Sequence, residues 1–393
     1  MSDRVTVVSR QGYFSRLGGA IKGILVGFLM FIVGFPVLFW NEGRAVQTRK
    51  SLDEGAGIVV SAQVTPRDAA LDGGLVHLSG PVVVDVPPRD PRFGIEQRAI
   101  RLERMVEMYQ WRETSETREE KKVGGSVERV TTYSYSKEWS SRLNDASGFQ
   151  QPAGHQNPSS MPFETASFQA QSGTMGDYRL DTGVLGKVGG WSELTVQPAD
   201  LAEDLREEFA THGEWLYRGA NPGVPEVGDM RVRFRYVPEQ TISVIARQSG
   251  DRLDAYPTQA GDSLLLVSSG DVSADHMFAQ AHAANNMLTW ILRFAGFMLM
   301  WIGLGLIFKP LSVLMDVIPL LGTIVGKGIG FVTFIIAAVL SLITIAIAWL
   351  FYRPLLGIAL LIVAGGLIYW MVVKRKKPVQ PPLVAEQPVP ASS

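Results

Sequence analysis

Apolar residues along the chain gather in two blocks that flank a long region of mixed character. The first block is an unbroken apolar run over residues 23–40, with Lys22 before it and Glu42 close behind it. A helix over this run is about 27 Å long at about 1.5 Å per residue, which matches the hydrocarbon core of a bilayer. The run ends in the bulky sequence Pro-Val-Leu-Phe-Trp, whereas a cleavable signal ends in small residues. The pattern therefore predicts an uncleaved transmembrane helix over residues 23–40, preceded by a basic tail over residues 1–22.

The second apolar block is long enough for several spans. Its character changes between Lys309 and Lys327, where a shorter apolar stretch contains Asp316 and Pro319. On a helical wheel the polar residues of this stretch fall on one narrow stripe, which is typical of a helix lying in the membrane interface. We therefore predict an interfacial amphipathic segment over residues 309–327, kinked at Pro319. The rest of the block and the chain end are predicted to form transmembrane helices over residues 287–308, 328–351 and 355–373 and a basic, then disordered, tail over residues 374–393.

Small residues recur at helical spacing on two of the predicted spans. Along the first span and just before it, Gly19, Gly23, Gly27 and Gly34 fall near one helical face. On the third span a similar stripe is formed by Thr333, Ala337, Ser341, Thr344 and Ala348. Because small side chains let a second helix approach closely, both stripes are expected to be packing faces, although glycine is also simply common in membrane helices.

The mixed region, residues 41–287, is predicted to be one β-rich domain. Its clearest strand is the stretch 230–236, in which apolar residues alternate with Arg231, Arg233 and Arg235. Such alternation indicates a sheet that is buried on one face only. We expect the three arginines to pair with acids on a neighbouring strand. The alternative is that they bind lipid phosphates, since arginine binds phosphate through two hydrogen bonds.

Two further elements are expected within this region. Residues 104–118 and 127–139 flank Gly124 and Gly125, which predicts a long β-hairpin with a charged, solvated tip. Residues 200–211 carry apolar residues four apart, which favours a helix. The predicted fold class is thus an α+β multipass membrane protein: one N-terminal transmembrane helix, a large mostly-β non-cytoplasmic domain, three C-terminal transmembrane helices and an interfacial helical segment.

The distribution of basic residues predicts the orientation of the chain. With the N-terminus inside, four spans return the C-terminus inside. Ten basic residues then lie on the cytoplasmic side, and they are Arg4, Arg10, Arg16, Lys22, Lys309, Lys327 and residues 374–377. Four lie outside near the spans, and they are Arg44, Arg49, Lys50 and Arg353. Because cytoplasmic flanks are enriched in Lys and Arg, the domain is expected on the non-cytoplasmic side.

Composition narrows the possible functions. The net charge of −1 gives no basic field for nucleic acid, so no nucleic-acid partner is expected. The chain has no cysteine, which excludes disulfides, thiolate metal sites and a cysteine nucleophile. The five histidines are scattered, and no nucleophile elbow, phosphate loop or paired-carboxylate motif is present. We therefore predict no catalytic residue, no metal site and no cofactor, and lean towards a protein that is not an enzyme.

Several short runs resemble one known family. They are Asn41-Glu42-Gly43-Arg44-Ala45, Val106-Glu107-Met108-Tyr109-Gln110-Trp111, Gly228-Asp229-Met230-Arg231-Val232 and Trp349-Leu350-Phe351-Tyr352-Arg353-Pro354-Leu355. In these runs, and in the order of one span, a large domain and clustered spans, the chain resembles the transmembrane protein 43 family, also called LUMA. The resemblance implies a self-associating membrane-organising protein, which in animals resides in the endoplasmic reticulum and inner nuclear membrane and is linked to emerin and lamins. Bacteria also have members, and the cysteine-free chain with long polar insertions favours a bacterial one, in the inner membrane with a periplasmic domain.

Three functions remain open on the sequence. The first is a scaffold that oligomerises through its spans, with the lipid bilayer and other membrane proteins as partners. The second is a membrane-associated enzyme acting on lipid or an exported substrate, for which His77 is a weak candidate. The third is a transporter or channel that uses Asp316.

Six polar residues are candidates for structural or membrane-interface roles. Asn41, Glu42 and Arg44 are expected to anchor the first turn of the domain against the bilayer. Arg293 is expected to snorkel to the headgroups. Asp316 lies on the interfacial stripe, and Arg353 lies in a tight turn between two spans.

Overall fold

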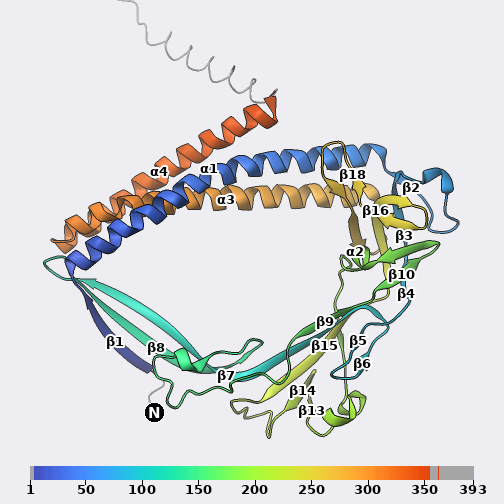
Figure 1. The fold of residues 1–393 in the computed structure, drawn as a ribbon, viewed down its shortest axis with the longest axis horizontal. Helices are drawn as coiled ribbons and strands as arrows, with labels where there is room; N and C mark the ends of the chain where they lie inside the picture. Colours follow the sequence, from blue (N-terminus) through green and yellow to red (C-terminus); the bar gives the residue numbers. More distant parts are fainter. Residues whose placement is uncertain (1–3, 355–361, 363–393) are drawn as a thin grey trace, which may run out of the picture.

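Three long helices lie side by side in one layer, and two β-sheets form most of the rest of the molecule (Figure 1). The computed structural model describes residues 4–354 and residue 362. The long helices are α1 (Tyr13–Ile58), α3 (Ala274–Met315) and α4 (Pro319–Tyr352). Each contains a segment long and apolar enough to cross a membrane, so the chain is an integral membrane protein. The predicted spans over 23–40, 287–308 and 328–351 fall within these helices, whereas the span over 355–373 and the tail over 374–393 lie outside the described residues, apart from residue 362.

The helices are longer than the predicted spans. Helix α1 continues without a break past residue 41, where the soluble domain was expected to begin, and ends only at Ile58. Helix α3 likewise begins thirteen residues before the predicted span at residue 287. The chain therefore leaves the apolar region on two continuous helices, and Asn41, Glu42 and Arg44 lie within α1 and not in a turn of the domain.

The predicted interfacial segment over residues 309–327 is the tip of a helical hairpin. Helix α3 runs on to Met315, the chain turns at residues 316–318, and α4 starts at Pro319. Proline at the first position of a helix loses no hydrogen bond and has a suitable fixed φ angle. Pro319 thus marks the beginning of a new helix, and the flanking halves belong to α3 and α4.

The first sheet carries the predicted hairpin and the arginine strand. Within the described residues its strands are β1 (Arg4–Gln11), β7 (Ala99–Lys121), β8 (Val127–Ser140), β9 (Ala166–Gln169), β12 (Ser192–Leu194), β13 (Ala210–His212), β14 (Trp215–Arg218) and β15 (Met230–Pro238). Strands β7 and β8 pair antiparallel from Met108↔Ser140 to Lys121↔Val127, which confirms the hairpin around Gly124 and Gly125. Residues 200–211 are not a helix. They form two short 3₁₀ turns followed by β13, because Leu201, Leu205 and Phe209 are drawn into the core beneath the sheet.

The arginines of β15 pair with acids, as expected. Arg231 donates from Nε to Oε2 of Glu107 at 2.7 Å, and Arg235 donates to Glu103, with both acids on the adjacent strand β7. Arg231 also lies over the ring of Trp215 at 4.3 Å, a cation–π contact. The hypothesis that these arginines bind lipid phosphates is therefore not needed, since neighbouring acids and aromatic rings already occupy them.

The second sheet lies against the ends of α1 and α3. In the part of the chain that the structure describes, its strands are β2 (Val60–Ser61), β3 (Leu75–Pro81), β4 (Val83–Val84), β10 (Ser172–Met175), β11 (Tyr178–Asp181), β16 (Thr241–Ser249), β17 (Arg252–Asp254) and β20 (Leu266–Ser269). Two small ribbons, β5 (Arg89–Asp90) with β6 (Ile95–Glu96) and β18 (Tyr256–Pro257) with β19 (Ser263–Leu264), and the short helix α2 (Thr182–Leu185) complete the fold.

The N-terminal strand and the hairpin reach back to the other end of the helix layer (Figure 1). Strand β1 pairs with β8 from Arg4↔Ser134 to Gln11↔Val127, so residues 4–22 are not simply a tail. The amide of Gly124 at the hairpin tip donates to the carbonyl of Val317 at 3.1 Å. Sheets with open edges do not occur in hydrocarbon, because their backbone groups would lack partners. The strands therefore cannot pass through a bilayer that α1 spans. The predicted orientation places the N-terminus and the β-rich domain on opposite sides of the bilayer. It is therefore incompatible with the pairing of β1 and β8, and it requires the two strands to separate.

Candidate functional site

The most distinctive polar cluster lies where α1, α3 and α4 meet. Glu42 on α1 is fully buried and accepts two hydrogen bonds from Arg293 on α3, from Nε to Oε1 at 2.6 Å and from Nη2 to Oε2 at 2.9 Å. The indole Nε1 of Trp349 on α4 donates to the same Oε2 at 2.8 Å. One carboxylate thus receives donors from the two other helices, and Arg293 points to Glu42 where snorkelling to the headgroups was expected.

A second part of the cluster is formed by Asn41 and Arg44, which flank Glu42 on α1. Arg44 donates to Oδ1 of Asn285 at 3.0 Å and to Oγ1 of Thr289 at 3.1 Å. The buried Asn41 donates from Nδ2 to the carbonyl of Thr289 at 3.0 Å. Asn285 donates in turn to the carbonyl of Ala45 at 3.0 Å. Asn41 and Arg44 therefore join α1 to α3 from within a continuous helix, where a first turn of the domain was expected.

This set, which we call the junction cluster, consists of Asn41, Glu42, Arg44, Asn285, Thr289, Arg293 and Trp349. A buried carboxylate or guanidinium is costly unless its partners are in place, so the charges of Glu42 and Arg293 strongly favour one alignment of the helices. Hydrogen bonds in such surroundings are also stronger than in water. The cluster can hold three helices in a fixed register, and it contains no nucleophile paired with a base.

Sequence reasoning found Asn41, Glu42, Arg44 and Arg293 but missed their partners. A signal was present, since Asn285 and Thr289 are four residues apart at the start of an apolar run and so share a helical face. Trp349 had no such signal, because an aromatic residue at the end of a span is equally typical of the membrane interface.

Glycines bring the apolar parts of α1 and α3 into close contact. A Cβ atom at Gly27 would lie 2.6 Å from the carbonyl oxygen of Gly303, and one at Gly303 would lie 2.6 Å from that of Gly27. A Cβ at Gly34 would lie 2.6 Å from Cγ of Met300. The glycine face is therefore confirmed at Gly27 and Gly34, whereas a Cβ at Gly19 or Gly23 would meet nothing within 4 Å.

The small-residue stripe of α4 is a packing face, as predicted. Thr333, Ala337, Ser341, Thr344 and Ala348 are all buried. Ser341 donates to the sulfur of Met300 on α3 at 3.2 Å. The stripe is thus used within one chain to join α4 to the other helices.

Asp316 lies at the opposite end of the helix layer and is 1% exposed. Its carboxylate accepts from Arg16 at the start of α1 and, at 2.6 Å, from Nζ of Lys121 at the hairpin tip. Residues 116–120 near the tip are exposed, as expected, whereas Lys121 ties the tip to the turn between α3 and α4. Since both carboxylate oxygens are occupied by cations, the geometry does not suggest a transport site.

The C-terminal end of α1 and the N-terminal end of α3 pack directly into the domain. Leu52 of α1 and Met277 and Phe278 of α3 are buried with Leu75 of β3 and Ile245 of β16. A Cβ at Gly55 would lie 2.4 Å from Cδ1 of Leu264, so this contact is also close. The helices and the second sheet therefore share one hydrophobic core.

The weak catalytic candidate His77 has structural partners, and so does the phenol of Tyr135. His77 is 8% exposed, with its ring nitrogens 3.2 Å from Oγ of Ser61 and 2.9 Å from the carbonyl of Val272. Burial and a hydrogen bond to Glu113 raise the pKa of the Tyr135 phenol, so this hydroxyl stays neutral. Among the described residues, no three His, Asp or Glu side chains come together as a metal site.

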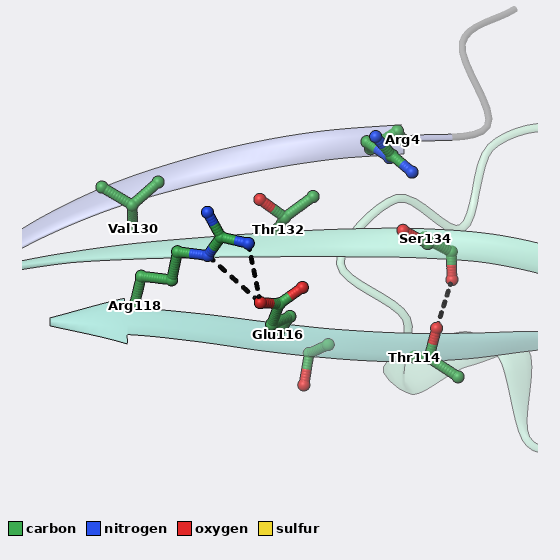
Figure 2. Close-up of a pocket in the computed structure, with 8 residues that line it drawn as sticks. Arg4, Thr114, Glu116, Arg118, Val130, Thr132 and Ser134 are labelled. Atoms are coloured by element: carbon green, nitrogen blue, oxygen red, sulfur yellow. Dashed lines mark hydrogen bonds and ion pairs between the residues drawn. The ribbon is translucent and has the colours of Figure 1, made fainter.

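The arm formed by β1, β7 and β8 carries a hollow of about 620 Å³, shown in Figure 2. Its lining is polar, but Arg118 donates to Glu116 at 3.1 Å and Thr114 donates to the carbonyl of Ser134 at 3.3 Å. These side chains are engaged with each other and with the backbone, and they do not form a pair of nucleophile and base.

Comparisons with known proteins agree with the architecture. The family model described as Transmembrane protein 43 matches residues 108–354. Transmembrane protein 43 of Homo sapiens is 38% identical over 389 residues, which cover 95% of this chain and 95% of that protein. The Mus musculus protein is 38% identical over 366 residues, with 90% of each chain covered, and the Drosophila melanogaster homolog is 33% identical over 355 residues, with 88% of this chain and 93% of the homolog covered. No solved structure matches the chain.

Proposed function

This chain belongs to the transmembrane protein 43 family, and on that premise we propose that it is a membrane-organising scaffold that holds a β-rich domain in a fixed position relative to the bilayer and associates with further copies of itself. The observation that carries the proposal is the continuity of α1 and α3. Each helix lies in the apolar layer at one end and is buried in the core of the domain at the other.

A scaffold needs a stiff connection, and the two helices provide one. Helix α1 has 46 residues and α3 has 42, and they pack against each other along their length. The junction cluster fixes their register at the point where the apolar segments end. A flexible linker between membrane and domain would allow the domain to move freely, whereas paired continuous helices do not.

Self-association is supported by the part of α1 that the other helices leave uncovered. Gly18 and Gly19 are exposed, and a Cβ atom at either glycine, or at Gly23, would meet nothing within 4 Å. Backbone that is accessible in this way permits close approach of another helix. We expect a second copy to pack here, because Gly27, Gly34 and the α4 stripe are already used within one chain.

The side of the membrane on which the domain lies is proposed from the distribution of basic residues. The count of ten basic residues against four supports a domain outside the cytoplasm. That side is the periplasm for a bacterial inner membrane and the lumen for the endoplasmic reticulum and inner nuclear membrane. In this orientation β1 lies in the cytoplasm, so β1 must separate from β8 and the hairpin tip from Asp316.

Native mass spectrometry from nanodiscs tests the proposal of self-association. The expected result is a discrete oligomer, which Gly19→Leu/Gly23→Leu reduces to the monomer because the bulky side chains cover the accessible backbone. The matched control is Leu25→Ala, on the exposed surface of the same helix, which should leave the oligomer unchanged. A monomer from the wild-type chain, supported by a lack of intermolecular cross-links in the membrane, would contradict self-association.

A further inference from the structure

A group of basic side chains surrounds Tyr352 where the apolar parts of α1 and α4 end. One hollow, of about 550 Å³, is lined by Trp40, Arg44, Lys50, Phe351 and Tyr352 among others. An adjoining hollow, of about 410 Å³, is lined by Arg49, Lys50, Tyr352 and Arg353 among others. Lys50 and Tyr352 line both, so the two hollows form one continuous site, which we call the interfacial basic site.

The charges of this site are poorly balanced. It contains four cations, Arg44, Arg49, Lys50 and Arg353, and one carboxylate, that of Asp53. Asp53 is 3.7 Å from Arg49. Among the described residues, no carboxylate lies within 4 Å of Lys50, Arg44 or Arg353. The hydrogen bonds of Arg44 go to neutral side chains, and its buried Nε atom has no partner.

The position of the site matches the headgroup level of a bilayer. Trp40 ends the apolar run of α1, and Phe351 ends that of α4. Trp40 is 59% and Phe351 74% exposed, so large apolar surfaces continue from the site towards the membrane interior. Tryptophan and tyrosine favour this level because one part of each ring is apolar and another is polar.

We propose that the interfacial basic site binds the phosphate of an anionic phospholipid. Lys50 and Arg353 contact the phosphate, since ammonium and guanidinium groups donate charge-assisted hydrogen bonds to phosphate oxygens. The hydroxyl of Tyr352, a residue that lines both hollows, is a further donor. The acyl chains lie along Trp40 and Phe351. The excess of three positive charges selects a headgroup of net negative charge over a zwitterionic one.

Native mass spectrometry of the detergent-solubilised full chain tests this assignment, with phosphatidylglycerol, phosphatidylcholine and inorganic phosphate as separate probes. The wild-type chain is expected to retain phosphatidylglycerol, and Lys50→Gln/Arg353→Gln is expected to lower the affinity at least tenfold. The control Arg67→Gln/Arg252→Gln removes the same charge from exposed positions of the domain and should bind like wild type. Lys50→Gln alone changes one exposed side chain and gives an intermediate loss in a chain whose fold is unaffected.

Each arm of the experiment has a defined meaning. Equal phosphatidylglycerol binding by the site variant and the control variant would overturn the proposal. Binding of phosphatidylcholine as tight as that of phosphatidylglycerol would overturn the selection by charge. Binding of inorganic phosphate, lost in the site variant, together with no lipid binding would identify a soluble phosphate as the ligand and would overturn the lipid assignment.

Discussion

Glu42 and Arg293, 251 positions apart in the sequence, form a buried ion pair with two hydrogen bonds between α1 and α3. The guanidinium of Arg293 also lies over the rings of Trp290 and Trp349, at 4.8 and 5.9 Å from their centroids. The pair is located where the apolar layer gives way to the domain-facing ends of the helices. Its geometry therefore fixes the register of the two elements that carry the domain.

Breaking this pair should destabilise the helix layer. Glu42→Ala leaves the Arg293 guanidinium buried without its partner, and Arg293→Ala does the same to the carboxylate. Each is expected to cost about 3–5 kcal/mol of unfolding free energy. Unfolding by dodecyl sulfate titration in mixed micelles measures this cost.

The control is an exposed ion pair on the same helix. Arg49 and Asp53 are 61% and 58% exposed, and Arg49→Ala should cost less than about 1 kcal/mol. The double variant Glu42→Ala/Arg293→Ala should cost less than the sum of the single changes, by about 0.5–3 kcal/mol. Strict additivity would show that the two side chains are not coupled.

The close approach of α1 and α3 should tolerate no side chain at its glycines. Gly27→Ala places a methyl group 2.6 Å from the carbonyl oxygen of Gly303, so the helices must move apart. We expect a loss of about 1–3 kcal/mol. Gly23→Ala, one turn away and open, should stay within about 0.5 kcal/mol of wild type. Equal thermal stability of the two variants would contradict the packing.

The pairing of β1 with β8 should depend on the bilayer. Val7 lies opposite Thr131, and the Cβ atoms of opposed residues are about 4.5–5.5 Å apart. Because the chain has no cysteine, Val7→Cys/Thr131→Cys introduces the only thiols. We expect them to form a disulfide in detergent, where one aqueous phase reaches both strands, and not in sealed membranes, where α1 separates them.

Val7→Cys/Arg252→Cys, which joins β1 to the second sheet, is the matched negative control and should not cross-link in either condition. A Val7–Thr131 disulfide formed in sealed membranes would place the N-terminal strand and the hairpin on the same side. That result would overturn the proposed orientation, and it would leave the contacts among α1, α3 and α4 intact.

The sequence was sufficient for the elements whose signal is local. The apolar runs predicted the three described membrane helices. The alternation of apolar residues with arginines predicted β15 and the pairing of its arginines with acids, and Gly124-Gly125 predicted the hairpin. Helix length was underestimated, because residues 43–58 are polar on one face and their buried face depends on α3. Residues 200–211 were misassigned since tertiary burial of three apolar residues outweighed their helical spacing.

Interactions between distant segments were not predictable in the same way. Glu42 was recognised as important, but nothing local identifies Arg293 or Trp349 as its partners. Asp316 was expected on the polar stripe of an interfacial helix, whereas its partners, Arg16 and Lys121, lie 300 and 195 positions away in the chain. A charge at such a position has several possible partners, and only the assembled helices select among them.

The rigid coupling of the domain to the membrane helices is the central claim, and a distance measurement tests it most directly. Spin labels at Leu25→Cys, exposed on the apolar part of α1, and at Arg252→Cys, exposed on β17, report on the two ends of the connection in nanodiscs. Pulsed electron–electron double resonance is predicted to give a single narrow distance distribution, which broadens when Glu42→Ala is added. A broad or multimodal distribution in the chain with an intact Glu42–Arg293 pair would contradict the account.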